Sequence, residues 1–204
     1  MRLPEGDSEL VRIVDAAWAD AARRAGPRLV CRVGCTQCCH GPFAIHALDA
    51  LRLRSGMEVL RTTDPSVAAA IEGRARAWIA EYGPDFPGDA ETGRLGESEE
   101  ARGRFEDFAD DAPCPALDPA SGRCDLYAWR PMTCRLFGPP VRVEGGSEEQ
   151  PALAHCELCF AGAHAAEVAA CEMHVPHDLE AQLLGKLDTV GDTVVAFALA
   201  DGRG

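Results

Sequence analysis

The stretch CRVGCTQCCH, residues 31–40, places four cysteines and a histidine within ten residues. Cys31, Cys35 and Cys38 have the spacing C-x3-C-x2-C, and Cys39 follows at once. Thiolates two to four residues apart on a glycine-containing loop can turn their sulfurs toward one point, as in zinc and iron–sulfur sites. Three ligands from this loop and one from elsewhere would complete such a site. Neighbouring side chains usually diverge, so Cys38 and Cys39 are expected to serve different atoms or different sites.

A second group consists of Cys114, Cys124 and Cys134, with nine residues between successive members. The segment CPALDPASGRCDLY, residues 114–127, predicts two brief strands around a Pro-Gly turn, which would bring Cys114 and Cys124 side by side. Pro131 is set to begin a helical turn, and a thiol early in a helix has a lowered pKa. We expect these three cysteines to meet the first loop.

A third group has the form C-x2-C…C-x2-H and consists of Cys156, Cys159, Cys171 and His174. Cys171 and His174 would share one face of a helix predicted over residues 161–173, because residues three apart are neighbours on a helix surface. This spacing is typical of zinc ligands. A second metal site and a set of free thiols both remain open for this group.

Disulfides are the main alternative use for ten cysteines in 204 residues. This density is below that of a disulfide-stapled scaffold, and a chain of this length can bury a core without staples. The acidic start, MRLPEGDSEL, has no apolar signal segment, and the longest apolar run, VVAFALA, is too short to cross a bilayer. We therefore expect a cytoplasmic protein whose cysteines ligate metal.

The charge balance excludes some partners. With 33 acidic and 20 basic residues the formal charge is −13, which argues against nucleic acid or an anionic membrane as the main partner. The expected partner is a metal ion or cluster. Several arginines stand within a few residues of a cysteine, where a cation favours the thiolate. Arg130 and Arg135 are expected either to donate hydrogen bonds to metal-bound sulfurs or to pair with Asp125.

The predicted elements that position these residues are mainly helical. Apolar spacing and capping residues predict helices over residues 8–24, 46–53, 65–82, 98–108, 161–173 and 178–187, and a helix or strand over 193–200. Residues 83–97 are expected to form an exposed linker or loop. The predicted fold class is mainly α with a small β-hairpin, in which helices surround an irregular cysteine-lined metal centre. We expect one domain over residues 1–204, with a motif core over 31–137 and a helical part over 152–204.

Together, CRVGCTQCC and CPALDPASGRCDLYAWRPMTCRLF resemble the YkgJ-type cysteine-cluster family, the zinc- or iron-chelating domain named for its CxxCxxCC motif. The second motif is the more specific: C-P-x-L followed by G-x-C-x-x-Y-x-x-R-P-x-x-C-R-x-F, with Cys114, Cys124 and Cys134 as its cysteines. The resemblance spans roughly residues 31–137. It implies zinc or an iron–sulfur cluster as the cofactor. One departure is the extra residue between Cys31 and Cys35.

The sequence leaves three functions open. The first is a metal-binding protein that holds zinc or an iron–sulfur cluster through cysteine thiolates. The second is an iron–sulfur enzyme related to the flagellin lysine methylases, which are similar in carrying a cysteine cluster and whose resemblance implies methyl transfer to a protein. The third is metal delivery or thiol-based redox sensing by Cys38 and Cys39. A radical-SAM enzyme is disfavoured, because the alternating strands and helices of a partial barrel are missing.

Overall fold

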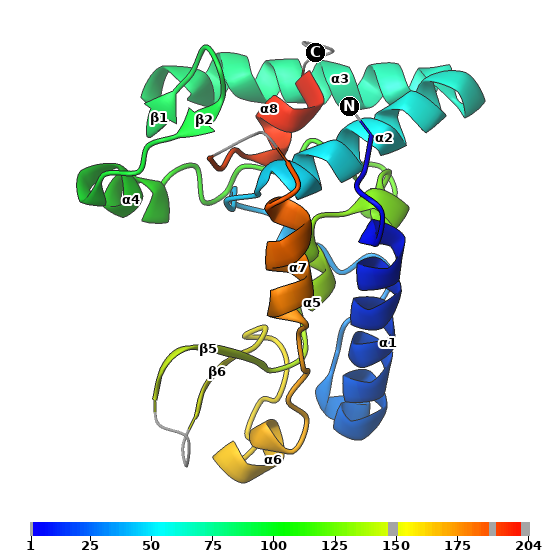
Figure 1. Cartoon of the computed structure of the whole chain (residues 1–204), viewed down its shortest axis with the longest axis vertical. Coiled ribbons are helices and arrows are strands. Elements are labelled where there is room, and N and C mark those ends of the chain that lie inside the picture. Colours follow the sequence, from blue (N-terminus) through cyan, green and yellow to red (C-terminus); the bar gives the residue numbers. More distant parts are fainter. Residues whose placement is uncertain (1, 147–150, 188–190, 201–204) are drawn as a thin grey trace. The chain divides into compact units, whose positions relative to one another are not determined.

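The computed structural model describes residues 2–146, 151–187 and 191–200 (Figure 1). The described chain is mainly helical with small two-stranded antiparallel sheets, which confirms the predicted fold class. Its residues group into two compact units: unit 1 comprises residues 2–3, 33–132, 187 and 191–200, and unit 2 comprises residues 4–32, 133–146 and 151–186. The single-domain organisation stays a prediction. None of the helices in the described residues is both long and apolar enough to cross a bilayer.

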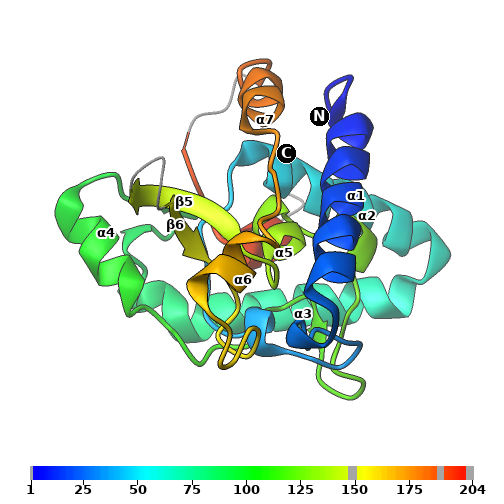
Figure 2. The same ribbon diagram turned by 90° about the horizontal axis from the view of Figure 1, so that it is seen from below.

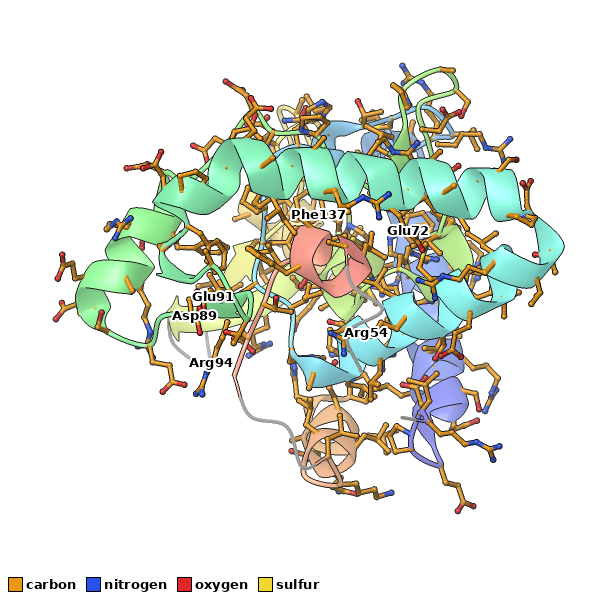
Figure 3. The ribbon with its side chains drawn as sticks, turned by 90° about the horizontal axis from the view of Figure 1, so that it is seen from above. Arg54, Glu72, Asp89, Glu91, Arg94 and Phe137 are labelled. Carbon is orange, nitrogen blue, oxygen red and sulfur yellow. The ribbon has the colours of Figure 1, made fainter. Side chains whose placement is uncertain are left out.

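Unit 1 is built on three helices that pack against one another: α2 (Ala47–Thr63), α3 (Pro65–Tyr82) and α8 (Val195–Ala200). Their buried side chains, including Leu53, Ile71 and Leu199, form one core cluster. Asp64 caps α3 by accepting a hydrogen bond from the Val67 amide at 3.2 Å. Glu72 on α3, labelled in Figure 3, accepts hydrogen bonds from Arg61 of α2 at 2.9 and 2.8 Å. The strand alternative for residues 193–200 is excluded.

Helix α2 is longer than the predicted 46–53, because tertiary packing overrides the low helix propensity of Gly56. A Cβ atom at Gly56 would stand 2.7 Å from ring atoms of Trp129 and 2.9 Å from Leu126. The missing side chain thus lets the short 3-10 helix Tyr127–Trp129 lie against α2. Asp49 accepts hydrogen bonds from Arg52 at 2.6 Å and from the Met132 amide at 2.8 Å, and its carboxylate is buried.

The segment 83–97 is largely exposed, as its Pro and Gly content predicts, but it contains short regular elements and a buried aromatic anchor. A 3-10 helix (Gly83–Asp85) leads into the hairpin β1 (Gly88–Asp89) and β2 (Arg94–Leu95). Phe86 is buried, and its ring lies 4.7 Å from that of Phe197 and 5.8 Å from that of Phe108, centroid to centroid. The aromatic contacts anchor the segment. Helix α4 (Glu99–Glu106), capped by Ser98, follows as predicted.

The cysteine-bearing middle of the chain contains the predicted hairpin, β3 (Leu117–Asp118) and β4 (Arg123–Cys124), followed by α5 (Met132–Leu136) directly after Pro131. The hairpin turns at Gly122, whose φ is +66°. Cys38 and Cys39 lie on a 3-10 turn, Gln37–Cys39. Another short 3-10 turn, Gly26–Arg28, lies in unit 2.

Unit 2 contains one long helix and several short elements (Figure 2). The long helix is α1 (Asp7–Ala25), which ends at Gly26 as predicted. The others are β5 (Val141–Gly146), β6 (Pro151–Ala154), α6 (Ala165–Ala169) and α7 (His177–Leu184). The paired β5 and β6 were not predicted. Helix α6 is shorter than the predicted 161–173. Gly162 has φ +73°, so the helix does not begin at residue 161, and the helix ends at Ala169 with Ala170 as its C-cap.

Candidate metal centre

All ten cysteines are free thiols, and they divide equally between the two units. The unit 1 thiols are Cys35, Cys38, Cys39, Cys114 and Cys124. The unit 2 thiols are Cys31, Cys134, Cys156, Cys159 and Cys171. The division falls inside the first motif: Cys31 belongs to one unit and Cys35 to the other. The only local sign of this break in the sequence is the extra residue between Cys31 and Cys35.

Backbone pairing brings the first loop and the second motif together in unit 1. The Cys114 amide donates to the Cys39 carbonyl at 2.8 Å, and the Gly41 amide donates to the Ala112 carbonyl at 3.0 Å. His40 and Pro113 form the β-bridge between these bonds. Gly41 has φ +73° and passes so close to the Asp110 carbonyl that a Cβ atom would stand 3.0 Å from it. This pairing sets Cys39 beside Cys114.

The β3–β4 hairpin also brings Cys124 close to Cys39 and Cys114, but its strand register differs from the predicted one. Cys124 stands opposite Leu117 rather than Cys114. Cys114 precedes the strand, and a turn in which the Leu117 amide donates to the Cys114 carbonyl at 2.9 Å folds it back. The hairpin tip reaches the first loop, since a Cβ at Gly122 would lie 3.6 Å from Thr36 and 3.7 Å from Gly34.

The unit 1 thiols lie close enough to influence each other's ionisation. A hydrogen bond with Cys39 lowers the pKa of Cys38 to about 7, and the same bond with Cys38 is the main cause that raises the pKa of Cys39. Burial raises the pKa of Cys114 to about 12, and the Cys124 and Cys38 thiols add to that rise. Burial also raises the pKa of Cys124. Four thiols from two distant segments therefore share one half-buried environment.

Arg130 and Arg135, which were predicted to share a role, have different contacts in the structure. Arg130 lies over the Tyr127 ring, 4.1 Å from its centroid, and its charge lowers the pKa of both Cys38 and Cys124. Arg135 is buried in unit 2 and donates to both carboxylate oxygens of Asp15 at 2.8 Å. The expected pairing of Arg130 or Arg135 with Asp125 is replaced by an ion pair between Asp125 and Arg74 at 2.6 Å. Sequence reasoning missed Arg74, which stands 51 residues from Asp125.

Four of the unit 2 thiols lie in one buried cluster. Cys156, Cys159 and Cys171 are buried, and Cys31 packs against them with Ala25 and Phe160. The sulfurs of Cys31 and Cys159 are 4.0 Å apart. We call Cys31, Cys156, Cys159 and Cys171 the unit 2 thiol cluster. Cys31 lies far in the sequence from the other three members, which fall within residues 156–171.

The predicted partnership of Cys171 and His174 on a helix face is wrong. Helix α6 ends at Ala169, and both residues follow it in non-helical backbone. Cys171 is buried, whereas His174 is exposed. The remaining unit 2 thiol, Cys134, is the third residue of α5, so its predicted position early in a helix is confirmed.

The donor chemistry fits a soft metal. Sulfur dominates both groups, and thiolates select zinc, Cu(I) or iron–sulfur clusters over hard cations. Across residues 2–146, 151–187 and 191–200, no three Cys, His, Asp or Glu side chains already surround a single metal position. Binding therefore requires the thiols to deprotonate and to converge on the metal, which couples metal binding to local folding.

The pockets near the two groups differ. In unit 1, a hollow of about 20 Å³ has Cys114 in its wall, beside Phe43 and Trp78. A volume of this size holds about one water molecule. In unit 2, a pocket of about 230 Å³ is lined by Cys156, His155, Phe137 and further residues, most of them apolar.

A third pocket, of about 370 Å³, lies in unit 1 and contains no thiol. Arg54 of α2 lines it together with Asp89 and Arg94 of the β1–β2 hairpin (Figure 3). Its charged wall is unlike the sulfur-rich surroundings of either cysteine group. It is therefore distinct from the candidate metal centre.

The comparisons with known proteins agree with this donor chemistry. No curated protein and no solved structure gives a significant match. A family model, CxxCxxCC, described as a "putative zinc- or iron-chelating domain", matches residues 30–159, which is more than half of the chain. The match includes nine of the ten cysteines and omits Cys171. On this match the chain belongs to the CxxCxxCC family.

Proposed function

We propose that the protein binds a soft metal through Cys38, Cys39, Cys114 and Cys124, with Cys35 on the same loop as a further ligand. One observation carries the proposal: the 3-10 turn at Cys38 and Cys39 is paired by backbone hydrogen bonds with the segment that begins at Cys114. The β3–β4 hairpin then supplies Cys124. Chain segments about 75 residues apart are joined where their thiols meet.

The metal is zinc or an iron–sulfur cluster. Both accept four thiolates, and the family description covers both. The cationic side chain of Arg130 supports either, since it offsets the negative charge of metal-bound thiolates. When bound, zinc would hold the fold, whereas a cluster would also supply redox chemistry.

The structure favours metal holding over the iron–sulfur enzyme at this site. Methyl transfer from S-adenosylmethionine needs a pocket beside the metal that admits both reactants. The hollow with Cys114 in its wall measures about 20 Å³, which is a small fraction of the ~300 Å³ or more typical of ligand pockets. The metal at the unit 1 thiols is therefore proposed to link the loop and the hairpin.

We also infer that the protein works in a reducing compartment such as the cytoplasm. All ten cysteines are free, and thiolate ligation requires them to be reduced. Mapping of thiols and disulfides in protein trapped by acid and alkylation inside cells would test this inference.

The first test is elemental analysis with a UV–visible spectrum on protein purified without oxygen and without a chelating tag. Iron with labile sulfide and broad visible absorption would identify a cluster, and zinc without colour would identify a zinc site. Cys114→Ser should lower the metal content, whereas Arg123→Gln, at an exposed residue beside Cys124, should not. Wild-type protein without metal, or equal losses in the two variants, would refute the proposed ligand set.

A further inference from the structure

The unit 2 thiol cluster is assembled by its own backbone contacts, independently of the unit 1 thiols. The Cys159 amide donates to the Cys156 carbonyl at 2.9 Å, which closes a C-x2-C turn. The next amide, of Phe160, donates to the Arg28 carbonyl at 2.9 Å. This bond ties the turn to the chain just before Cys31. Cys171 enters the same buried cluster from the turn that follows α6.

Two backbone features adapt the chain to this cluster. Phe160, directly after the C-x2-C turn, has φ +58°, a conformation that non-glycine residues rarely adopt. Such a conformation persists only where the surroundings impose it, and it is often found at functional sites. Gly138 has φ +114° and passes Cys31 so closely that a Cβ atom would stand 2.9 Å from its sulfur. The Gly138 carbonyl also accepts a hydrogen bond from the Cys156 amide at 3.3 Å.

One sulfur–sulfur distance bears on the kind of metal site. Zn–S bonds of about 2.3 Å in a tetrahedron place two sulfurs roughly 3.8 Å apart. The sulfurs of Cys31 and Cys159 are 4.0 Å apart, close to that value. In a [4Fe–4S] cluster each cysteine binds a different iron, so the thiolates stand farther apart. The distance therefore fits two thiolates on one tetrahedral ion.

We propose that Cys31, Cys156, Cys159 and Cys171 form a second metal site, which takes one Zn²⁺ and is separate from the unit 1 site. Zinc displaces the thiol protons and cross-links the chain after α1, the turn at 156–159 and the turn after α6. The proposal includes Cys171, which lies outside the family match, and excludes the exposed His174. It uses none of the unit 1 thiols and does not depend on their function.

A zinc ion that cross-links these segments would help to stabilise unit 2, which has mostly short helices. Apart from α1, the described helices of unit 2 have at most eight residues. Short helices bury little apolar surface, and small units commonly use metals or disulfides to compensate. Three of the four thiols are buried and Cys31 is partly buried, with apolar neighbours such as Ala25, Leu29 and Val168. A metal in these surroundings would be shielded from water.

The test begins with full-length protein loaded with Zn²⁺, and with Co²⁺ as a spectroscopic probe. Zinc per chain is counted by native mass spectrometry and elemental analysis. Cys159→Ser and Cys171→Ser should each lose one zinc per chain relative to wild type. They should also lose part of the intense Co²⁺–thiolate absorption. Ala163→Ser is the matched control, because it places the same hydroxyl side chain beside the cluster without removing a thiol, and it should keep the wild-type count.

A readout without mutation guards against variants that fail to fold. Wild-type protein is alkylated with and without bound Zn²⁺, and the modified cysteines are mapped by mass spectrometry. Zinc should protect Cys31, Cys156, Cys159 and Cys171 together, including in a Cys114→Ser background. Failure of the unit 1 proposal alone would leave this protection intact. Alkylation of the four thiols at equal rates with and without zinc, or protection that disappears in Cys114→Ser, would overturn the second site.

Discussion

At the scale of single residues, Arg130 is a positively charged side chain that acts on the unit 1 thiols. Its guanidinium is held over the Tyr127 ring and donates to the Tyr127 carbonyl at 2.9 Å, so its position is fixed. From there its charge favours the thiolate forms of Cys38 and Cys124. The neighbouring Arg123 is exposed on β4, and its charge is not among the main influences on the pKa of Cys124.

We therefore expect Arg130→Gln to weaken metal binding at the unit 1 thiols about tenfold or more, as substitutions of residues around metal ligands commonly do. Competition with a chelator of known affinity measures the effect. Arg123→Gln removes the same charge one residue from Cys124 and should leave the affinity unchanged. Equal effects of the two substitutions would show that only net charge matters.

The buried ion pair of α2 gives a second prediction at this scale. Asp49→Asn keeps an acceptor for the Met132 amide but removes the negative charge beside the buried Arg52. Removing one charge of a buried ion pair is strongly destabilising, so the free energy of unfolding should fall by about 3 kcal/mol or more. Urea denaturation measures the change. Glu97→Gln, which breaks the exposed pair with Arg94, should cost less than about 1 kcal/mol; similar costs for both would contradict the expectation.

At the scale of elements, the contact of α2 with the Tyr127–Trp129 helix depends on Gly56. Gly56→Ala would place a methyl group 2.7 Å from the Trp129 ring, and overpacking of this kind costs about 1–3 kcal/mol. Gly73→Ala on α3 adds the same methyl where no atom lies within 4 Å, so better helix propensity should stabilise the protein by up to about 1 kcal/mol. Thermal denaturation of both variants checks these opposite signs. A neutral Gly56→Ala would mean that Trp129 moves freely.

The elements also show what the sequence could predict. Helices α1 and α3 follow from periodic apolar residues and from local stop and cap signals at Gly26 and Asp64. The extension of α2 past Gly56 and the anchoring of Phe86 depend on aromatic rings from other parts of the chain. The hairpin at Gly122 has a local turn signal. Elements set by local signals could therefore be predicted from the sequence, whereas features imposed by tertiary packing could not.

At the scale of the whole molecule, the decisive fact is that the cysteines divide between two units. The preference for a soft metal was predictable from the sequence, because thiols at these spacings favour such metals. Which cysteines lie together was not predictable, because the unit boundary falls between Cys31 and Cys35, within a motif that resembles a single site. Likewise, Cys171 and His174 have zinc-like spacing but differ in burial. The proposed ligand sets thus depend on contacts between distant segments, such as that of Cys31 with Cys159, 128 residues apart.

This division predicts a two-part response of the whole chain to metal removal. Helices α2 and α3 bury Leu53, Met57 and Ile71 in an apolar core, so their amides should stay protected from hydrogen exchange. Residues 28–32 and 156–171, which the proposed zinc would cross-link, should exchange much faster once a chelator has removed the metal. Exchange followed by mass spectrometry on the full-length protein resolves both regions. Re-addition of Zn²⁺ should restore protection at 156–171. In a Cys171→Ser variant it should not, and restoration there would show that the thiol of Cys171 is not what couples zinc to the folding of unit 2.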